Sequence, residues 1–385
     1  MATSLNLSPE RDERRTLVVV FLRGAADGLT LVAPVEDDRY HEFRPRLAVK
    51  KSEAVKLDDM FGLHPNLRAL ESLWKDGELA IVHGAGGESD TRSHFEAQDL
   101  MEHGGDVAGG WLARYLRTRG QNQSPLSAVA LAPTLPESLS GAPSAAAFQS
   151  LEEFALTSQA SRTADQNFVR ELERLYAGGP SPLRTASANT FDALRRIEAI
   201  DTKAASMNGA VYDAKDPFAL GLRQVAQLIR ADVGLDAATV DLGGWDSHFT
   251  QQTLIEPLML KLANGLAAFR RDLGSRMATT TVVVMTEFGR RVAENSAFGT
   301  DHGRGGAMFA FGGGIKGGRV FSQPTATGSA WPGLQPEALA GPGDLPVWNN
   351  YRDILAPILQ RHGASPAHLA QIFPGFSQHP LALYS

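Results

Sequence analysis

Residues 16–28 read "TLVVVFLRGAADG", a continuous apolar run followed by a short polar loop that contains Asp27. A strand that is buried on both faces has this composition, because neither face needs polar side chains. The run Leu17–Leu22 is as long as one strand and too short to cross a membrane. It therefore predicts a buried strand of a parallel sheet, with Asp27 just beyond its carboxyl end.

Similar apolar runs recur along the chain, at residues 78–87, 126–133, 237–241, 281–286 and 306–312. Between them lie stretches whose apolar residues are spaced three and four apart, which is the pattern of an amphipathic helix. Buried strands that alternate with helices predict an α/β fold in which a mostly parallel central sheet is sandwiched by helices. We expect residues 16–385 to form this single domain.

Residues 151–229 break the alternation, because they read as successive helices without an intervening strand. The loops "SGAPSAA" and "AGGPSPLRTAS" in and beside this segment are rich in Pro, Gly and Ser, which is typical of hinges. We expect a helical insertion that caps the substrate site. Residues 1–15 are polar and charged, and we expect them to form a flexible N-terminal segment.

The composition narrows the classes of function. Of 385 residues, 43% are hydrophobic and 21% are charged, which is ordinary for a globular protein. A net charge of −6 gives no support to a nucleic-acid partner. The absence of cysteine excludes disulfides and thiolate metal ligands, so a bound metal would need His, Asp, Glu or hydroxyl ligands. We expect no membrane span, and a cytoplasmic location, or a periplasmic one if an export signal has been trimmed; the sequence leaves the oligomeric state open.

Chemically active side chains follow the predicted strands at the point where each strand ends. Since ligands of open parallel sheets bind at the carboxyl ends of the strands, we expect these side chains to gather at one edge of the sheet. They come from five segments of the chain: Asp27; Thr91, Arg92, Ser93 and His94; Asp246 and His248; Glu287 and Arg290; and Asp301 and His302, which directly precede a strand.

Each of these residues also has a purely structural interpretation. Asp27 suits a turn, Ser93 suits a helix N-cap, and Asp246 can cap the helix that follows it. Glu287 and Arg290 can form an ordinary salt bridge. The Asp301–His302 pair is least well explained in this way, because glycines flank it on both sides. The sequence alone leaves these alternatives open.

Several motifs together resemble the bacterial family called "domain of unknown function 1501". They are "FLRGAADGLTLVAP", "TRSHFEAQDLME", "GWLARYL", "GGWDSH", "TEFGR" and "GTDHGRGGAMFAFGGGIKGG", in the family's order between about residues 17 and 360. That family is grouped with the alkaline phosphatase and sulfatase-like superfamily. The resemblance implies an alkaline-phosphatase-like fold, a metal centre at the strand ends and a nucleophile at the start of a helix.

The resemblance also implies roles for individual residues. Ser93, with Thr91 as the second candidate, resembles the nucleophile. The implied metal ligands are Asp27, Asp246, His248, Glu287, Asp301 and His302. Where a second metal site of the superfamily has an Asp–His pair, "TEFGR" offers only Glu287, so one divalent ion is expected and a second is left open. Zinc, manganese and calcium all remain possible at this stage.

The implied activity is that of a metal-dependent hydrolase or transferase acting on a small or polymeric phosphate or sulfate ester. His94 would orient the nucleophile or protonate the leaving group, while Arg92, Arg290 and Arg304 would bind the anion. The sulfatase motif Cys-x-Pro-x-Arg is missing, which slightly favours phosphate. The alternative is a catalytically decayed protein that binds an anionic ligand, polymer or protein partner. A Ser–His–Asp esterase is disfavoured, because the sequence has no Gly-x-Ser-x-Gly motif.

Overall fold

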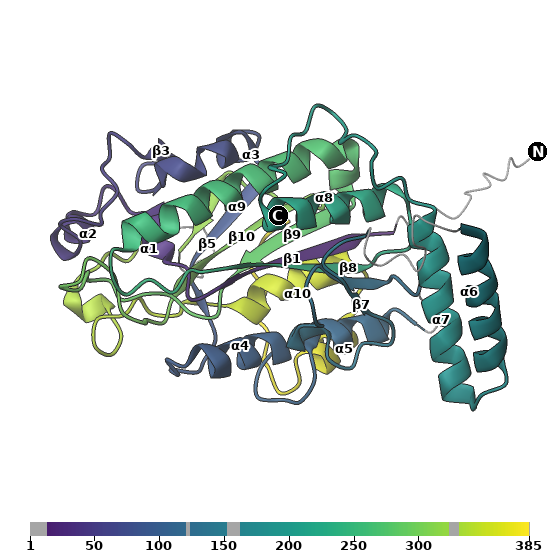
Figure 1. The fold of residues 1–385 in the computed structure, drawn as a ribbon. Coiled ribbons are helices and arrows are strands. Elements are labelled where there is room, and N and C mark those ends of the chain that lie inside the picture. Colours follow the sequence, from purple (N-terminus) through teal and green to yellow (C-terminus); the bar gives the residue numbers. More distant parts are fainter. Residues whose placement is uncertain (1–13, 121–123, 152–161, 323–330, 385) are drawn as a thin grey trace, which may run out of the picture.

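A central sheet with helices on both faces forms the body of the protein (Figure 1). The computed structural model describes residues 14–120, 124–151, 162–322 and 331–384. Within these residues the sheet has nine strands in the order β11-β5-β10-β9-β1-β8-β6-β7, with β12 beside β5. The strands are β1 (Thr16–Arg23), β5 (Leu79–Gly86), β6 (Ala128–Ala130), β7 (Ala146–Ala147), β8 (Ala237–Gly243), β9 (Thr280–Met285), β10 (Gly306–Gly312), β11 (Arg319–Phe321) and β12 (Asn349–Asn350).

The sheet is mostly parallel, as the continuous apolar runs predict. The central strand β1 pairs in parallel with β8 on one side and with β9 on the other. The exception is β10, which is antiparallel to both β9 and β5. Its amino end therefore lies at the same edge of the sheet as the carboxyl ends of β1, β8 and β9. Residues that precede β10 consequently reach the edge that residues following the other strands reach.

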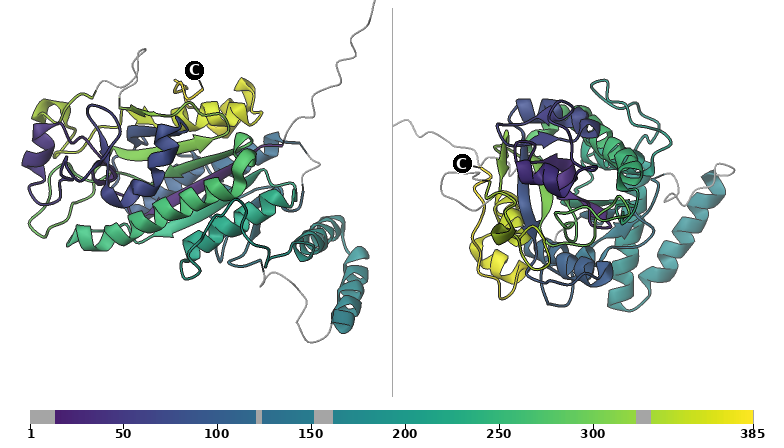
Figure 2. Two further views of the ribbon diagram at one scale, coloured as in Figure 1. Left: turned by 90° about the horizontal axis from the view of Figure 1, so that it is seen from above. Right: turned by 90° about the vertical axis from the view of Figure 1, so that its left-hand side faces the viewer.

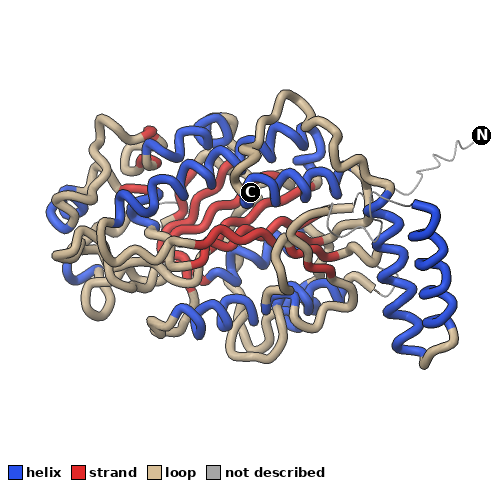
Figure 3. Tube along the Cα trace, in the orientation of Figure 1, coloured by secondary structure: helices blue, strands red, loops and turns tan. Residues whose placement is uncertain are grey.

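Side chains along β1 alternate between two apolar cores, one on each face of the sheet. Leu17, Val19 and Phe21 belong to one core, and the residues between them belong to the other. Helices cover both faces of the central sheet (Figure 3). The face of Leu17 is covered by α5 (Trp111–Thr118), α10 (Tyr351–Arg361) and α11 (Pro366–Ile372); the opposite face is covered by η1 (Pro65–Leu70), α3 (Glu71–Lys75), α8 (Pro217–Arg230) and α9 (Gln251–Leu273). The predicted sandwich is thereby confirmed.

The fold also contains a set of shorter elements outside the central sheet. A second, three-stranded sheet has the order β2-β4-β3. These elements are α1 (Gly28–Leu31), β2 (Val32–Ala33), α2 (Asp38–Phe43), β3 (Val55–Lys56), β4 (Gly62–Leu63), α4 (His94–His103), η2 (Glu137–Leu139), η3 (Gly274–Ala278) and η4 (Pro336–Ala338).

The start of α4 is fixed by the capping residues seen in the sequence. The Oγ of Ser93 accepts a hydrogen bond from the backbone N–H of Glu96, so Ser93 is the N-cap. The helix ends at Gly104, whose φ of +75° is the left-handed conformation that suits glycine at a helix end. His94 is therefore the first residue of α4, at the sheet edge where the polar loops gather.

The predicted helical insertion is only partly a separate unit. α6 (Arg162–Ala177) and α7 (Ser181–Glu198) form a hairpin, whereas α8 packs on α9 and β8 as part of the main helical layer. The hairpin lies at the end of the sheet opposite the loops that follow β1 and β8 (Figures 1 and 2). This position differs from the predicted substrate-facing cap, because the apolar face of α7, including Ile197, joins the core at the far end of the sheet. Residues 152–161 lie outside the described part.

The N-terminal segment was expected to be flexible over residues 1–15. Residues 1–13 lie outside the described part of the chain. Arg14 and Arg15 lie within it, and their guanidinium groups donate to the carbonyls of Gly234 and Ala278. The last two residues of the segment are thus attached to the body beside the start of β1. Among the described helices, none has both the length and the apolar character needed to cross a membrane.

Candidate metal centre

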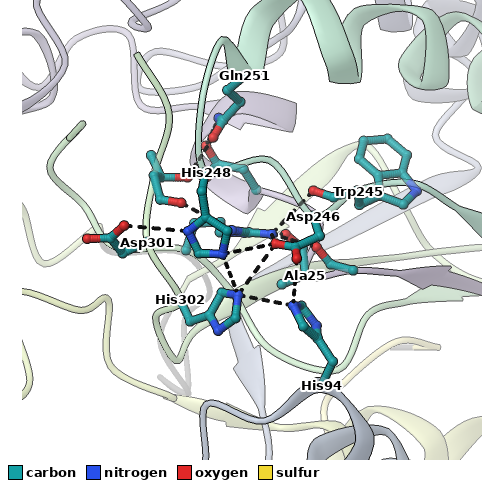
Figure 4. Close-up of polar contacts among 12 residues, drawn as sticks. Ala25, His94, Trp245, Asp246, His248, Gln251, Asp301 and His302 are labelled. Atoms are coloured by element: carbon teal, nitrogen blue, oxygen red, sulfur yellow. Dashed lines mark hydrogen bonds and ion pairs between the residues drawn. The ribbon is translucent and has the colours of Figure 1, made fainter. Parts of the chain in front are cut away.

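Three imidazole rings and one carboxylate converge at the carboxyl edge of the sheet (Figure 4). The Nε2 of His302 lies 2.8 Å from the Nε2 of His248 and 3.0 Å from the Nε2 of His94. The carboxylate of Asp246 lies 3.1 Å from the Nε2 of His248, 3.4 Å from that of His302 and 3.5 Å from that of His94. We call these four residues the histidine cluster. Asp246, His248 and His302 were among the metal ligands that the family resemblance implies. His94 was expected at the same edge of the sheet but not as a metal ligand, and the structure places it beside them.

In each histidine of the cluster, the Nδ1 atom points away from the other rings and faces an oxygen atom of the protein. The atoms facing the Nδ1 positions are carboxylate or carbonyl oxygens, which can only accept hydrogen bonds, so in the neutral rings of His94 and His302 the Nδ1 carries the proton. These partners are Glu287 for His94 at 2.8 Å, the Arg92 carbonyl for His302 at 2.8 Å and Asp301 for His248 at 3.5 Å. In the neutral rings the lone pairs of the Nε2 atoms are consequently directed at one another. Histidine ligands of metal sites are oriented by contacts of this kind.

Nitrogen lone pairs that face each other at the His302–His94 and His302–His248 distances repel unless a cation, either a proton or a metal ion, lies between them. Around a tetrahedral zinc ion the nitrogen ligands lie roughly 3.3 Å apart, because Zn–N bonds measure about 2.0–2.1 Å. The nitrogens of His94 and His248 are 3.0 and 2.8 Å from that of His302, so a small outward shift would admit the ion. One ligand atom each from His94, Asp246 and His302 lie within 4.8 Å of one another. Nitrogen-rich donors with one carboxylate fit zinc or manganese better than calcium, which prefers oxygen ligands.

The charges around the histidine cluster suit the binding of a cation. Partial burial acts to raise the pKa of Asp246, but the hydrogen bond and positive charge of Arg290 outweigh it and lower this pKa to about 2. Burial lowers the pKa of His302, so that its ring is neutral at pH 7. The hydrogen bond to Glu287 raises the pKa of His94, so a metal ion would compete with a proton there.

Arg290 joins the loops that carry the site and is not free to bind an anion. Its side chain is 1% exposed, and every nitrogen of its guanidinium donates to the protein. The acceptors are the carbonyls of Gly24, Ala25, Trp245 and Thr300 and the carboxylate of Asp246. These contacts connect the loops after β1 and β8 with the segment before β10. The geometry therefore differs from the predicted anion-binding role and gives Arg290 a positioning role.

Asp27 lies away from the histidine cluster, in a buried ion pair with Arg44. The two side chains are 2% and 0% exposed, and the shortest distance between a guanidinium nitrogen and a carboxylate oxygen is 2.6 Å. Thr30, Gln251 and the backbone N–H of Leu29 also donate to the carboxylate. Although burial acts to raise the pKa of Asp27, the charge of Arg44 lowers it. Its oxygens are fully engaged, so the structure differs from the implied metal-ligand role.

Glu287 and Asp301, which were expected to bind metal, lie behind the histidine cluster and hold two of its rings. The side chain of Glu287 is fully buried and also accepts hydrogen bonds from the backbone N–H of Gly24 and from Gln98. Asp301 accepts from Asn295 and faces the Nδ1 of His248. Their carboxylates orient the imidazoles that face the shared point.

The predicted nucleophiles precede His94 in the chain. The Oγ1 of Thr91 donates to a carboxylate oxygen of Glu96 at 2.6 Å. Ser93 is exposed, and its Oγ caps α4 by accepting from the Glu96 N–H at 3.5 Å. The two hydroxyls therefore have different surroundings, and only that of Thr91 has a carboxylate that can take its proton.

Of the other two predicted anion-binding arginines, Arg92 is largely engaged within the protein. It donates to the His302 carbonyl and to the buried carboxylate of Asp344. The Nη2 of Arg304 donates to the Glu88 carbonyl at 2.9 Å. The Nε of Arg304 is buried and makes no hydrogen bond with any described residue. Arg304 thus retains donor capacity for a ligand.

We predict that Glu287→Gln weakens metal binding about 10–100-fold, the usual effect of removing a carboxylate behind a histidine ligand. The amide keeps the size of the side chain but loses the charge that favours the Nδ1–H of His94. Calorimetric titration with zinc measures the affinity. Asp99→Asn, which changes an exposed carboxylate on α4, the helix that begins with His94, is the control. Equal affinities for the two variants would contradict the prediction.

The fold and the histidine cluster define an α/β protein with a candidate metal centre at the strand ends. The chain belongs to the family described as "Protein of unknown function (DUF1501)", whose family model matches residues 14–364. The resemblance drawn from the sequence motifs is thereby confirmed. A search of curated protein sequences found no match.

Solved structures with a similar fold include, by their titles, a zinc complex and an alkaline phosphatase. One is the C-terminal periplasmic domain of EcEptC from Escherichia coli in complex with Zn, at 9% identity, covering 78% of this chain and 73% of that chain with a TM-score of 0.37. The other is alkaline phosphatase from the Antarctic bacterium TAB5, at 11% identity, covering 77% and 91% with a TM-score of 0.31. At these values the likeness carries no assignment of function, which depends on the residues of this chain alone.

Proposed function

We propose that this protein is a metal-dependent hydrolase or transferase that acts on a phosphate or sulfate ester through a threonine or serine hydroxyl. The observation that carries the proposal is that His94, Asp246 and His302 each offer a ligand atom within 4.8 Å of the other two, while His248 approaches this group through His302 and Asp246. A hydrogen-bond acceptor behind each ring supports it, because the Nε2 lone pairs are then directed inward. Zinc or manganese fits this set of ligands.

A divalent ion held by the histidine cluster would neutralise negative charge on the ester oxygens and lower the pKa of a neighbouring hydroxyl. The chain supplies the other groups. Glu96 accepts a hydrogen bond from the Thr91 hydroxyl and is placed to take its proton as the oxygen attacks phosphorus or sulfur. The bond to the ester oxygen breaks as the new bond forms, and the alcohol or phenol leaves with a proton from solvent. Water or an acceptor alcohol then takes the phosphoryl or sulfuryl group from Thr91. The donors left on Arg304 suit the anionic oxygens of the ester.

The proposal is tested by metal analysis of the purified protein and by turnover of aryl phosphates and aryl sulfates with added zinc, manganese or calcium. We expect close to one zinc or manganese ion per chain and measurable hydrolysis of at least one ester class. Failure to retain any metal would overturn the proposal. Metal binding without turnover of any ester would instead identify the decayed, anion-binding protein that the sequence left as the alternative.

We predict that Thr91→Val lowers kcat by roughly 10³-fold or more, because it removes the hydroxyl that contacts Glu96. Ser93→Ala should keep kcat within about tenfold and instead cost about 1 kcal/mol of stability, since it removes the N-cap of α4. Steady-state kinetics on an aryl ester and thermal unfolding measure the two effects. The reverse ranking of the kcat values would identify Ser93 as the nucleophile, and unchanged kcat in both variants would exclude a nucleophilic hydroxyl from this pair.

A further inference from the structure

A cavity of about 180 Å³ lies beside the histidine cluster and shares a wall with it. Phe288 and Glu287 both line this cavity. The ring of Phe288 stacks on His94 with centroids 5.0 Å apart and lies at the same distance from the ring of His302. Glu287 holds the Nδ1 of His94. Phe288 and Glu287 therefore contact the histidine cluster and also form part of the cavity wall.

The cavity is apolar over most of its wall and also has polar lining residues. Its apolar lining consists of Ala97, Leu100, Met101, Phe288, Val347 and Tyr351. The hydroxyl of Tyr351 already donates to the Leu100 carbonyl at 3.1 Å, so it is not an unmet polar group. The polar lining includes Thr91 and Arg304, which we assign to attack and to anion binding, together with Glu88, Ser89, Asp106 and Glu287. A ligand in this cavity would thus contact apolar side chains while it lies beside the reacting groups.

The helix α4 links the cavity to the histidine cluster. His94, Ala97 and Met101 are spaced three and four residues apart, so they lie on one face of the helix. Ala97 and Met101 are buried, at 5% and 3% exposure. A substitution at either position changes the size of the cavity and leaves the four residues of the cluster in place.

We infer that this cavity receives the apolar organic group of the ester and makes the protein selective for esters of phenols or apolar alcohols of similar size. An apolar cavity of about 150 Å³ takes a benzene ring, so a volume of about 180 Å³ is sufficient for one aromatic ring. A sugar or another polyhydroxylated alcohol would lose hydrogen bonds to water there without replacing them. The role of the anionic group in this inference rests on the proposed function.

Two matched pairs of ligands test the inference by direct binding. For the zinc-loaded protein, calorimetry should give phenylphosphonate an affinity at least tenfold higher than that of methylphosphonate, which has the same anionic group without the ring. Ala97→Leu, which fills the cavity, should abolish this preference and leave the affinity for methylphosphonate within threefold. Ala367→Leu, the same change on an exposed helix position, should leave both affinities unchanged.

Phenol, which has no anionic group, separates the cavity from the metal centre. Saturation-transfer NMR should detect phenol on the wild-type protein with or without metal and should lose the signal in Ala97→Leu. If that variant fails to fold, Gly87→Val serves instead, because a Cβ at Gly87 meets only the ring of Tyr351, at 3.7 Å. Undetectable binding of phenol, or binding that neither substitution reduces, would overturn the inference. Phenol binding without ester turnover would count against the proposed function alone.

Discussion

Replacing His302 with alanine is expected to abolish stoichiometric metal binding and to lower the rate of ester hydrolysis by about 10³-fold or more. The Nε2 of His302 is the atom of the histidine cluster that approaches both other imidazoles, at 2.8 and 3.0 Å. Removing it deprives the ion of one nitrogen ligand and leaves Asp246 as the remaining member of the cluster that approaches both His94 and His248. Loss of the Lewis acid costs several kcal/mol of transition-state stabilisation, which corresponds to this loss of rate.

Metal analysis and steady-state kinetics measure this effect, and metal-free thermal unfolding shows whether the variant is folded. In the absence of metal we expect the variant to be at least as stable as the wild-type protein, because the substitution also removes a repulsive lone pair. His379→Ala, which removes an exposed imidazole outside the histidine cluster, is the control and should retain its metal. Full metal content in His302→Ala would place the ion elsewhere.

Asp27→Asn is expected to lower the free energy of unfolding by about 3–5 kcal/mol while leaving metal affinity unchanged. The carboxylate is the charge partner of Arg44, whose side chain is 0% exposed. An amide in its place leaves a buried guanidinium uncompensated, and breaking a buried ion pair in this way costs about that much. This prediction separates the structural role of Asp27 from the metal-ligand role that the family resemblance implies.

Urea denaturation and calorimetric zinc titration measure the two quantities on one preparation. Asp37→Asn is a suitable control, because Asp37 also caps a short helix, α2, without a buried guanidinium beside it. It should change the free energy of unfolding little, because asparagine caps a helix about as well as aspartate does. If Asp27→Asn kept its stability and lost its metal, Asp27 would be a ligand and the histidine cluster would be incomplete without it.

The fold was predictable because strands that are buried on both faces have a distinctive composition. The runs at Leu17–Leu22, 78–87 and 281–286 coincide, within a residue at each end, with the strands β1, β5 and β9 of the central sheet. The direction of β10 was not predictable, since an apolar run that is covered on both faces looks the same in a parallel or an antiparallel strand. The position of the α6–α7 hairpin also depends on contacts that helical periodicity does not specify.

The segments that form the site were predictable from the sequence, but the structural role of each side chain was not. The rule that ligands gather at strand ends placed His248 and His302 at one edge on the basis of the sequence alone. Whether a carboxylate faces a metal or the back of an imidazole depends on packing between distant segments, as for Glu287 and His94. The partner of Asp27, Arg44, carries no motif that indicates it. Much of the cavity wall lies inside the quoted motifs, with Ala97 and Met101 in "TRSHFEAQDLME" and Phe288 in "TEFGR", but nothing in these motifs indicates a pocket.

The central position of β1 has a consequence for how the chain acquires its structure during synthesis. β1 precedes the other described strands in the chain, and its two neighbours, β8 and β9, begin only at Ala237 and Thr280. A ribosome that adds about 5–20 residues per second needs on the order of 10–50 s to reach them. During that interval β1 lacks both of the strands with which it forms hydrogen bonds. We therefore expect a chaperone that recognises extended apolar chain to bind β1 until β8 and β9 have been made.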